Sequence, residues 1–224
     1  TDRLSDAARV FLAAEGFEAD RFQIEAIEAI ERGASVVVTA PTGSGKTLIA
    51  EAAIEIALAA GKRAFYTTPI KALSNQKYRD LVSRYGESGT GLLTGDNSLN
   101  GEAPVVVMTT EVLRNMIYAG SEALDGLGVV VLDEVHYLQD RYRGSVWEET
   151  IIHLPADVQL VNLSATVANG EEFAGWVKER RGSTELVVEE ERPVPLDSMY
   201  LLRDRYHGNA LEWFPVLGKD GLRP

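Results

Sequence analysis

One short segment limits the possible folds of this chain more than any other. Residues 40–47 read Ala-Pro-Thr-Gly-Ser-Gly-Lys-Thr, directly after the apolar run Val36 to Thr39 and at the start of a helical pattern near Lys46. A strand, a glycine-rich loop and a helix in this order form a phosphate-binding loop, because backbone amides and the helix N-terminus then face one anion. A glycine-rich turn formed by chance is the alternative, and the surrounding strand and helix argue against it.

The residue types in this loop match the parts of a nucleoside triphosphate. Gly43 and Gly45 let backbone amides close around the β-phosphate, Lys46 can reach the β- and γ-phosphates, and the Thr47 hydroxyl can bind Mg²⁺. The strict motif has glycine where this chain has Ala40. We therefore predict binding of ATP and Mg²⁺, with nucleotide contacts from Thr42, Gly43, Ser44, Gly45, Lys46 and Thr47.

Short β-branched runs alternate with helical patterns up to about Pro195. We expect strands at residues 35–39, 63–68, 91–94, 105–109, 129–133, 159–163 and 186–188. We expect helices at residues 22–32, 46–60, 71–85, 145–154 and 171–180. This alternation predicts an α/β fold, a parallel β-sheet with helices on both faces, in which ligands bind at the carboxyl ends of the strands.

An apolar strand, Leu127 to Leu132, ends in the acidic sequence Asp133-Glu134-Val135-His136. Two adjacent carboxylates at a strand end call for a cation, so we predict that Asp133 holds the Mg²⁺ and that Glu134 orients and deprotonates the attacking water. A solvated acidic turn is the alternative. We assign His136 a catalytic role as a relay between the nucleotide and Ser164-Ala165-Thr166, and a core histidine is its alternative.

Two further segments belong to the predicted nucleotide end. Ser164 and Thr166 follow the strand at residues 159–163, so their hydroxyls are expected at the same sheet edge as Asp133, where they would couple ATP to movement. Thr166 could instead begin the next turn as a cap. Gln23 opens a helix before the phosphate loop, where its amide could select adenine, or it could be an exposed helix residue.

Polar residues after three other strands suggest a surface for a nucleic-acid backbone, because short polar side chains, cations and helix N-termini bind phosphate. Each segment alone could be an ordinary capped helix. A shared sheet edge favours a groove for nucleic acid. The predicted contacts are Pro69, Lys71, Asn75, Thr94, Gly95, Thr110, Glu111 and Arg114. The segment at residues 140–144 could also touch RNA, although a solvated loop is the better interpretation of it.

Composition sets outer limits on these interpretations. The chain has 224 residues, a net charge of −12 and no cysteine, so disulfides and thiolate metal sites are excluded. The acidic balance opposes nucleic-acid binding unless basic residues gather along one local surface. No apolar run is long enough to span a membrane and no signal sequence is evident, so we expect a cytoplasmic protein that acts as a monomer.

The motifs together resemble one family, the superkiller-like, exosome-associated branch of superfamily 2 helicases, and in particular the bacterial HelY type. The resemblance runs from Phe22 to about Leu196. Its most specific segments are Arg143 to Glu149 and Arg192 to Leu196, which other helicase branches lack. The remaining segments that carry it are residues 22–23, 40–47, 68–77, 91–96, 108–114 and 133–136.

This resemblance implies an ATP-dependent RNA helicase that moves 3′ to 5′ and works with RNA-decay machinery. It assigns residues 1–196 to a first RecA-like, ATP-binding domain and residues 197–224 to a connector toward a second one, which carries the arginine fingers. Without that second domain, we expect this fragment to hydrolyse ATP only slowly. A DNA helicase or repair translocase is the main alternative, while a small-molecule kinase and a nucleotide-gated binding module are weaker ones.

Overall fold

The computed structural model describes most of the chain, and its chain path divides into two compact units, Thr1–Glu191 and Arg192–Pro224. The described residues are 4–140, 143–165, 170–194, 199–204, 210–215, 217–218 and 221–222. Five residues of the segments discussed above lie outside these ranges: Arg141, Tyr142, Thr166, Pro195 and Leu196. Each unit is described by itself.

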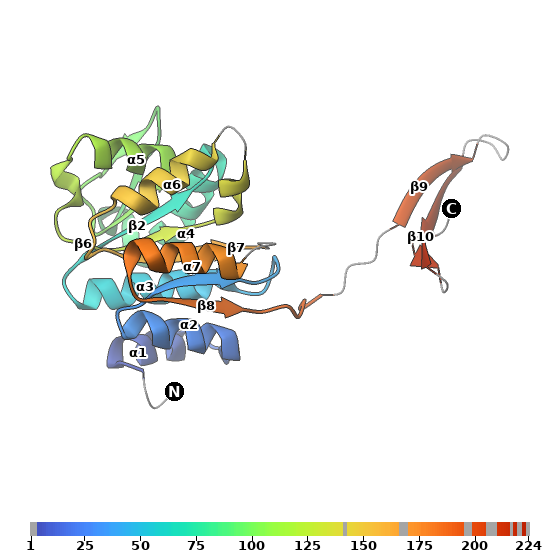
Figure 1. Ribbon diagram of the computed structural model, residues 1–224, viewed down its shortest axis with the longest axis horizontal. Coiled ribbons are helices and arrows are strands. Elements are labelled where there is room, and N and C mark those ends of the chain that lie inside the picture. Colours follow the sequence, from blue (N-terminus) through green and yellow to red (C-terminus); the bar gives the residue numbers. More distant parts are fainter. Residues whose placement is uncertain are drawn as a thin grey trace. The chain divides into compact units, whose positions relative to one another are not determined.

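An eight-stranded sheet forms the centre of the first unit (Figure 1). Its order is β4-β3-β5-β2-β6-β7-β1-β8, and every neighbouring pair is parallel except β3 with β4. The strands are β1 (Ser35–Thr39), β2 (Arg63–Thr68), β3 (Thr90–Leu93), β4 (Ser98–Leu99), β5 (Val105–Thr109), β6 (Leu127–Leu132), β7 (Gln159–Ser164) and β8 (Thr184–Val188). The predicted parallel α/β sheet is confirmed, and the short antiparallel strand β4 is an addition to it.

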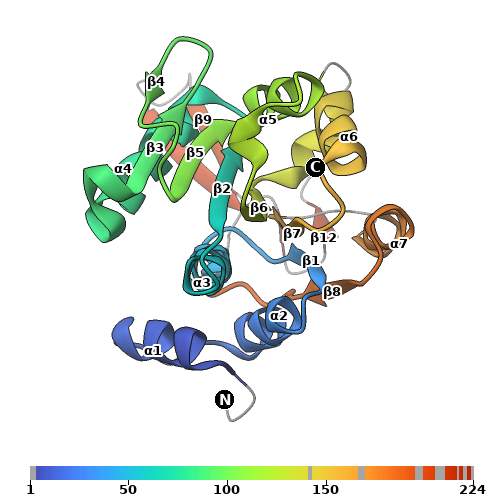
Figure 2. The ribbon, with the colours of Figure 1, turned by 90° about the vertical axis from the view of Figure 1, so that its left-hand side faces the viewer.

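Helices cover both faces of this sheet, as predicted (Figure 2). One face packs against α2 (Arg21–Glu31), α3 (Lys46–Ala59) and α4 (Lys71–Gly89), and the other against α5 (Thr110–Tyr118), α6 (Gly144–His153) and α7 (Gly170–Arg181). Gly86 has a φ of 74°, which breaks the helical path of α4 one residue after the predicted end at Tyr85. Strands β1, β2, β5 and β6 are almost wholly buried because both of their faces are covered.

The first helix, α1 (Asp6–Ala14), belongs to the same unit. Its buried Ala8 and Phe11 pack with Ile27 of α2 and with Leu48 and Ala52 of α3. The Arg84 guanidinium of α4 lies 4.7 Å from the centre of the Phe11 ring and pairs with Glu15, just after α1. Apolar burial and this cation–π contact therefore attach the N-terminal segment to the α3–α4 side of the domain.

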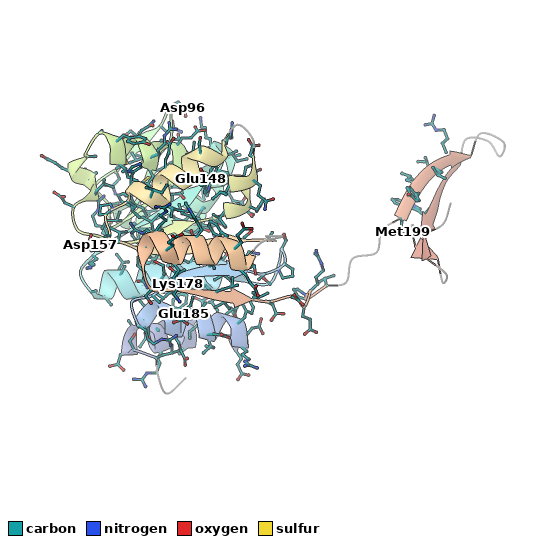
Figure 3. All side chains as sticks on the ribbon, viewed as in Figure 1. Asp96, Glu148, Asp157, Lys178, Glu185 and Met199 are labelled. Carbon is teal, nitrogen blue, oxygen red and sulfur yellow. The ribbon has the colours of Figure 1, made fainter. Side chains whose placement is uncertain are left out.

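The strand order brings the predicted nucleotide residues to one edge. Thr39 at the end of β1 pairs with Ser164 at the end of β7, and Leu132 at the end of β6 pairs with Asn162 of β7. The phosphate loop and the acidic sequence therefore both emerge at the carboxyl ends of central strands, beside β7. Asp96 and Glu185 mark the two ends of the sheet in Figure 3, near β3 and in β8.

The second unit consists of two short antiparallel pairs. Strands β9 (Met199–Asp204) and β10 (Ala210–Pro215) pair with Met199 opposite Pro215, and β11 (Leu217–Gly218) pairs with β12 (Gly221–Leu222). The side chains of Tyr200 and Trp213 are at least half exposed. The unit begins at Arg192, close to the predicted boundary after residue 196, and its role as a connector stays a prediction.

Candidate functional site

The loop after β1 has the backbone of a phosphate cradle. Gly43 and Gly45 have φ values of 86° and 82°, which side chains other than glycine rarely adopt. A Cβ atom added at Gly45 would lie 2.6 Å from the Gln23 Nε2 atom, so space as well as conformation requires glycine there. The loop opens helix α3, of 14 residues, and the free amides and partial positive charge of that helix N-terminus face the cradle.

Lys46 lies over its own loop. Its Nζ atom donates hydrogen bonds to the carbonyl oxygens of Ala40 at 2.6 Å and Pro41 at 3.0 Å. Burial lowers the pKa of Lys46, and the carboxylates of Glu134 and Asp133 act in the opposite direction. The Lys46 ammonium is thus partly desolvated, held by neutral carbonyls, and within electrostatic reach of both predicted catalytic carboxylates.

Gln23 contacts the phosphate loop directly. Its Nε2 donates to the carbonyl oxygens of Ser44 and Gly45 at 3.3 and 3.1 Å, and its Oε1 accepts from the Asp20 backbone amide at 2.8 Å, which completes a capping box on α2. The side chain is buried, unlike the exposed helix residue considered as the alternative. The oxygen and the nitrogen of the Gln23 amide are therefore both hydrogen-bonded to backbone groups. The predicted contact of Gln23 with adenine stays a prediction.

Asp133 is fixed from three sides. Its Oδ1 accepts a hydrogen bond from the Glu134 amide at 2.9 Å, and its Oδ2 accepts one from the Tyr66 hydroxyl at 2.6 Å. Its backbone amide donates to the Thr67 carbonyl at 3.0 Å, which continues the pairing of β6 with β2. The carboxylate is thus held in one orientation at the end of β6.

Glu134 has an unusual backbone and an unusual environment. Its φ of 53° and ψ of 43° are left-handed, which costs roughly 1 kcal/mol for a residue other than glycine. Burial, and then the neighbouring Asp133 charge, raise the pKa of Glu134, while His136 and Lys46 oppose this. A raised pKa makes this carboxylate a better proton acceptor, and strained residues of this kind are common at functional sites.

The predicted coupling residues are only partly brought together. His136 Nδ1 lies 3.2 Å from the Glu134 Oε2 atom, and its ring is 5.1 Å from that of Tyr137, centre to centre. Ser164 is buried, its carbonyl accepts from the Ala40 amide at 3.1 Å, and its Oγ finds no hydrogen-bond partner among the described residues. The relay from His136 to Ser164 stays a prediction, and Thr166 lies outside the described residues.

Half of the predicted nucleic-acid contacts line one open cavity of about 290 Å³, which we call the nucleic-acid cavity after that prediction. Lys71 forms an ion pair with Asp96 at its rim, and Thr94 Oγ1 donates to the same Asp96 carboxylate at 3.1 Å. Four predicted contacts line the cavity, together with neighbouring residues and with Arg143, which directly precedes α6. The lining residues are Pro69, Ile70, Lys71, Gly95, Asp96, Thr109, Glu111 and Arg143.

The other predicted contacts lie elsewhere or are covered. Thr110 is buried, and its hydroxyl donates to the Thr68 carbonyl at 3.3 Å, so it supports the start of α5. Arg114 lies 3.6 Å from the Glu149 carboxylate of α6. Asn75 is not among the residues that line the cavity. The binding roles of all eight predicted contacts stay predictions, and only Lys71 among the predicted cations lines the cavity.

The donor groups fit a nucleotide with a hard metal ion better than a metal held by the protein alone. Within the described ranges, no three histidine, aspartate, glutamate or cysteine side chains gather as a metal site. Mg²⁺ is usually bound by one or two protein oxygens, with phosphates and water completing its shell. Asp133 and the Thr47 hydroxyl can supply those oxygens, and the buried Ser44 Oγ lacks a partner among the described residues.

Comparison with known proteins agrees with this geometry. Residues 20–173, which include the phosphate loop and the acidic sequence, match the family described as DEAD/DEAH box helicase. The chain belongs to the DEAD/DEAH box helicase family. This confirms the predicted helicase family, and the matched segment excludes α1 and the second unit.

Relatives of this helicase domain are much longer proteins. The chain is 63% identical over 219 residues to "Probable helicase HelY" of Mycobacterium tuberculosis strain H37Rv, covering 95% of this chain and 24% of that protein. It is 58% identical over 186 residues to "DExH-box ATP-dependent RNA helicase DExH15 chloroplastic" of Arabidopsis thaliana, covering 80% and 16%. The chain thus spans a quarter or less of the length of these relatives, and the HelY resemblance is confirmed.

A solved helicase structure shares the fold. The Mycobacterium smegmatis helicase Lhr, bound to single-stranded DNA and AMP-PNP, superimposes with a TM-score of 0.67 at 28% identity, covering 84% of this chain and 28% of that one. This likeness confirms the helicase fold class of the first unit. In the part of the chain that the structure describes, none of the helices is both long and apolar enough to cross a membrane.

Sequence patterns did not single out Tyr66, and they gave an RNA contact by Arg143 only as the less favoured interpretation of its segment. Tyr66 lies inside a buried strand, and only the pairing of β2 with β6 brings its hydroxyl to Asp133. Arg143 belongs to a segment whose better interpretation was a solvated loop, but it lines the nucleic-acid cavity. A phenol in the buried middle of a strand was the one available signal for Tyr66.

Proposed function

We propose that this chain is the first motor domain of an ATP-dependent RNA helicase. One observation carries the proposal: Lys46 of the phosphate loop lies within electrostatic reach of Asp133 and Glu134, which end a central strand of the same sheet. A lysine for phosphate, an aspartate for metal and a glutamate for water are the groups that ATP hydrolysis needs.

Each residue has a defined task in this proposal. Lys46 leaves the carbonyls of Ala40 and Pro41 and binds the β- and γ-phosphates, while Thr47 and Asp133 hold the metal. Mg²⁺, when bound, offsets the negative charge that develops on the phosphates. Glu134 accepts the proton of the attacking water, and its raised pKa favours this step.

The nucleic-acid cavity is proposed to bind the backbone of one strand. Lys71 and Arg143 provide positive charge there, and the start of α4 provides free amides. Asp96 and Glu111 also line the cavity, so two carboxylates balance its two cations. The net charge of −12 opposes binding less at this neutral lining, since binding depends on the field near the phosphates. We propose RNA as the substrate, ahead of DNA, because the plant relative at 58% identity is named as an RNA helicase.

Competition between RNA and DNA tests the substrate. Single-stranded RNA and DNA of one sequence would be titrated against the chain in the presence of a non-hydrolysable ATP analogue and Mg²⁺. We expect RNA to bind more tightly, because only RNA carries the 2′-hydroxyl. Equal binding or a preference for DNA would contradict the RNA assignment.

A DNA helicase or repair translocase is the second candidate. The structural relative bound to single-stranded DNA favours it, and contacts with the phosphate backbone do not separate the two nucleic acids. A preference for DNA in the same competition would establish this candidate.

The remaining proposals concern the longer protein. The chain spans 24% of its mycobacterial relative, so unwinding, 3′ to 5′ movement and a link to RNA decay are proposed for the whole protein. The isolated chain should hydrolyse ATP slowly, since arginine fingers supplied by a second domain are worth about 10³ to 10⁵ in rate. Rapid RNA-stimulated turnover by this chain alone would contradict that view.

A further inference from the structure

Tyr66 is a buried polar residue with one partner of special interest. It lies in β2, its side chain is fully buried, and its hydroxyl donates to Asp133 Oδ2 at 2.6 Å. Its ring faces the side of the sheet that packs against α3 and α4. A phenol buried between strand and helix therefore reaches the carboxylate that is proposed to hold the metal.

With this hydrogen bond, each oxygen of the Asp133 carboxylate has a donor that fixes its position. The Glu134 amide holds Oδ1 and the Tyr66 hydroxyl holds Oδ2, so the plane of the carboxylate is fixed by one donor that follows β6 and one donor within β2. A carboxylate oxygen can accept two hydrogen bonds, so each oxygen keeps capacity for a metal ion or a metal-bound water. Such outer partners orient a metal ligand without touching the metal.

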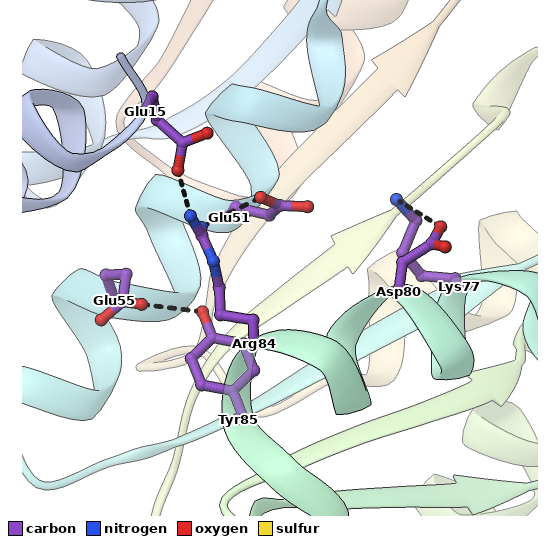
Figure 4. A network of polar contacts seen from close by, with 7 residues as sticks. All are labelled: Glu15, Glu51, Glu55, Lys77, Asp80, Arg84 and Tyr85. Carbon is purple, nitrogen blue, oxygen red and sulfur yellow. Dashed lines mark hydrogen bonds and ion pairs between the residues drawn. The ribbon is translucent and has the colours of Figure 1, made fainter.

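Tyr66 also contacts the helix that starts at the nucleic-acid cavity. The Lys77 Nζ atom of α4 lies 5.2 Å from the centre of the Tyr66 ring, and only 13% of the Lys77 side chain is exposed. Its ion pair with Asp80, at 3.9 Å, is long (Figure 4). Lys77 thus rests against the Tyr66 ring, six residues along the helix from Lys71 at the cavity.

The rest of α4 is firmly attached. Arg84 pairs with Glu51 of α3 at 3.0 Å and with Glu15, and the Tyr85 hydroxyl donates to Glu55 of α3 at 3.0 Å (Figure 4). The end of α4 is therefore tied to α3, the helix that begins at the phosphate loop. Lys77 lies in α4 between the cavity and these anchors. A movement at the start of α4 would therefore change the contact of Lys77 with the Tyr66 ring.

We propose that Tyr66 is a positioning residue that sets the orientation of Asp133 for metal binding, and that Lys77 links this orientation to nucleic acid held at the start of α4. The inference rests on the proposed nucleotide and metal site. It adds a buried residue to that site and a physical connection from the nucleic-acid cavity to the metal ligand.

The experiment compares Tyr66→Phe with Tyr85→Phe in the 224-residue chain. Each variant removes one hydroxyl that donates to a carboxylate, but only Tyr66 contacts Asp133. Binding of a fluorescent ATP analogue would be measured across Mg²⁺ concentrations. We expect Tyr66→Phe to need about tenfold more Mg²⁺ for half-maximal binding, as for loss of other outer partners of metal ligands. Tyr85→Phe should match the wild type.

The outcomes separate this inference from the function on which it rests. No Mg²⁺-dependent binding by the wild type would contradict the proposed nucleotide site itself. Normal binding by the wild type with an unchanged Mg²⁺ midpoint in Tyr66→Phe would overturn the positioning role alone. Thermal unfolding of both phenylalanine variants checks that each is folded, and a change in binding shared by both would also overturn the specific role of Tyr66.

A second variant tests the link through α4. We expect single-stranded RNA to lower the Mg²⁺ midpoint of the wild type. In Lys77→Met we expect the same midpoint with RNA as without it. Lys77→Met retains a long apolar stem at a mostly buried position. An RNA response in Lys77→Met equal to that of the wild type, or none in the wild type, would overturn the link.

Discussion

The nucleotide end and the nucleic-acid cavity lie at the same edge of one sheet, but they are held in different ways. At the nucleotide end, Lys46 and Asp133 are fixed mainly by backbone groups and by the buried Tyr66. At the cavity, the Lys71 cation is exposed and pairs with the exposed Asp96 carboxylate. In the proposed function, nucleotide binding requires Lys46 only to leave two neutral carbonyls, whereas nucleic-acid binding must replace an ion pair between two charged side chains.

Replacement of the proposed base should have the largest effect. Glu134→Gln removes the proton acceptor but keeps the shape of the side chain, so single-turnover hydrolysis should slow by about 10² to 10⁴. Nucleotide affinity should stay close to that of the wild type, and the exposed Glu25→Gln serves as the control. Hydrolysis at the wild-type rate in Glu134→Gln would remove Glu134 from the mechanism.

Gln23→Ala tests how far the nucleotide end is preformed. The change removes two hydrogen bonds to the phosphate loop, so affinity for an ATP analogue should fall by about tenfold. Comparison with a GTP analogue sharpens the result. Equal losses for both nucleotides indicate that Gln23 acts by holding the loop, whereas a loss confined to ATP supports the predicted adenine contact.

RNA affinity at the cavity should rise when a negative charge is removed and fall when a positive charge is removed. Asp96→Asn frees Lys71 and should strengthen RNA binding by roughly twofold to fivefold, since an exposed ion pair is weak and competes only modestly with phosphate. Lys71→Ala should weaken binding and lower the salt slope by about 1, because one phosphate contact is lost. Affinities measured by fluorescence anisotropy at several salt concentrations check both. Weaker binding by Asp96→Asn would contradict the internal ion pair as a competitor of phosphate.

The smallest expected effect concerns stability. Burial raises the pKa of Glu51 above its ordinary value of 4.5, although Lys77 and Arg84 oppose this. The folded state therefore holds this proton longer than the unfolded state, and the Glu51 contribution to stability is lost as pH rises from about 4.5 through the folded pKa. Glu51→Gln should thus gain stability relative to the wild type over that window.

Urea unfolding at a series of pH values measures this difference. The exposed Glu18→Gln should show no such trend and serves as the matched control. A relative stability of Glu51→Gln that falls as pH rises would show that the Arg84 pair outweighs burial at Glu51.

Local patterns were enough to predict most of the fold. Each predicted strand is present within a few residues of its expected ends, because apolar runs and glycine breaks are local signals. The pattern did not reveal β4, which has two residues and is exposed, so it leaves no apolar signature. The pairs β9–β10 and β11–β12 were also missed, in a segment that mixes charged and apolar residues.

The candidate site likewise contains residues with a local sequence signal and residues without one. The phosphate loop and acidic sequence could be predicted because their chemistry is carried by contiguous residues at strand ends. Tyr66 could not, because its contact with Asp133 depends on strand pairing. Arg143 could be suggested only as the less favoured interpretation, because its position at the cavity depends on the path of a loop. The sequence position of Thr110 suggested a nucleic-acid contact. Its hydroxyl is buried against the Thr68 carbonyl, a placement that sequence could not show, and the contact stays a prediction.

Nucleotide binding by Lys46→Ala tests the central claim most directly. A fluorescent ATP analogue with Mg²⁺ would be titrated into the wild type, Lys46→Ala and the control Lys62→Ala, whose exposed lysine precedes β2 at the opposite edge of the sheet. Loss of the charged contacts to two phosphates should weaken binding by roughly 100-fold in Lys46→Ala alone. Equal affinity of all three proteins would contradict the assignment of the nucleotide site.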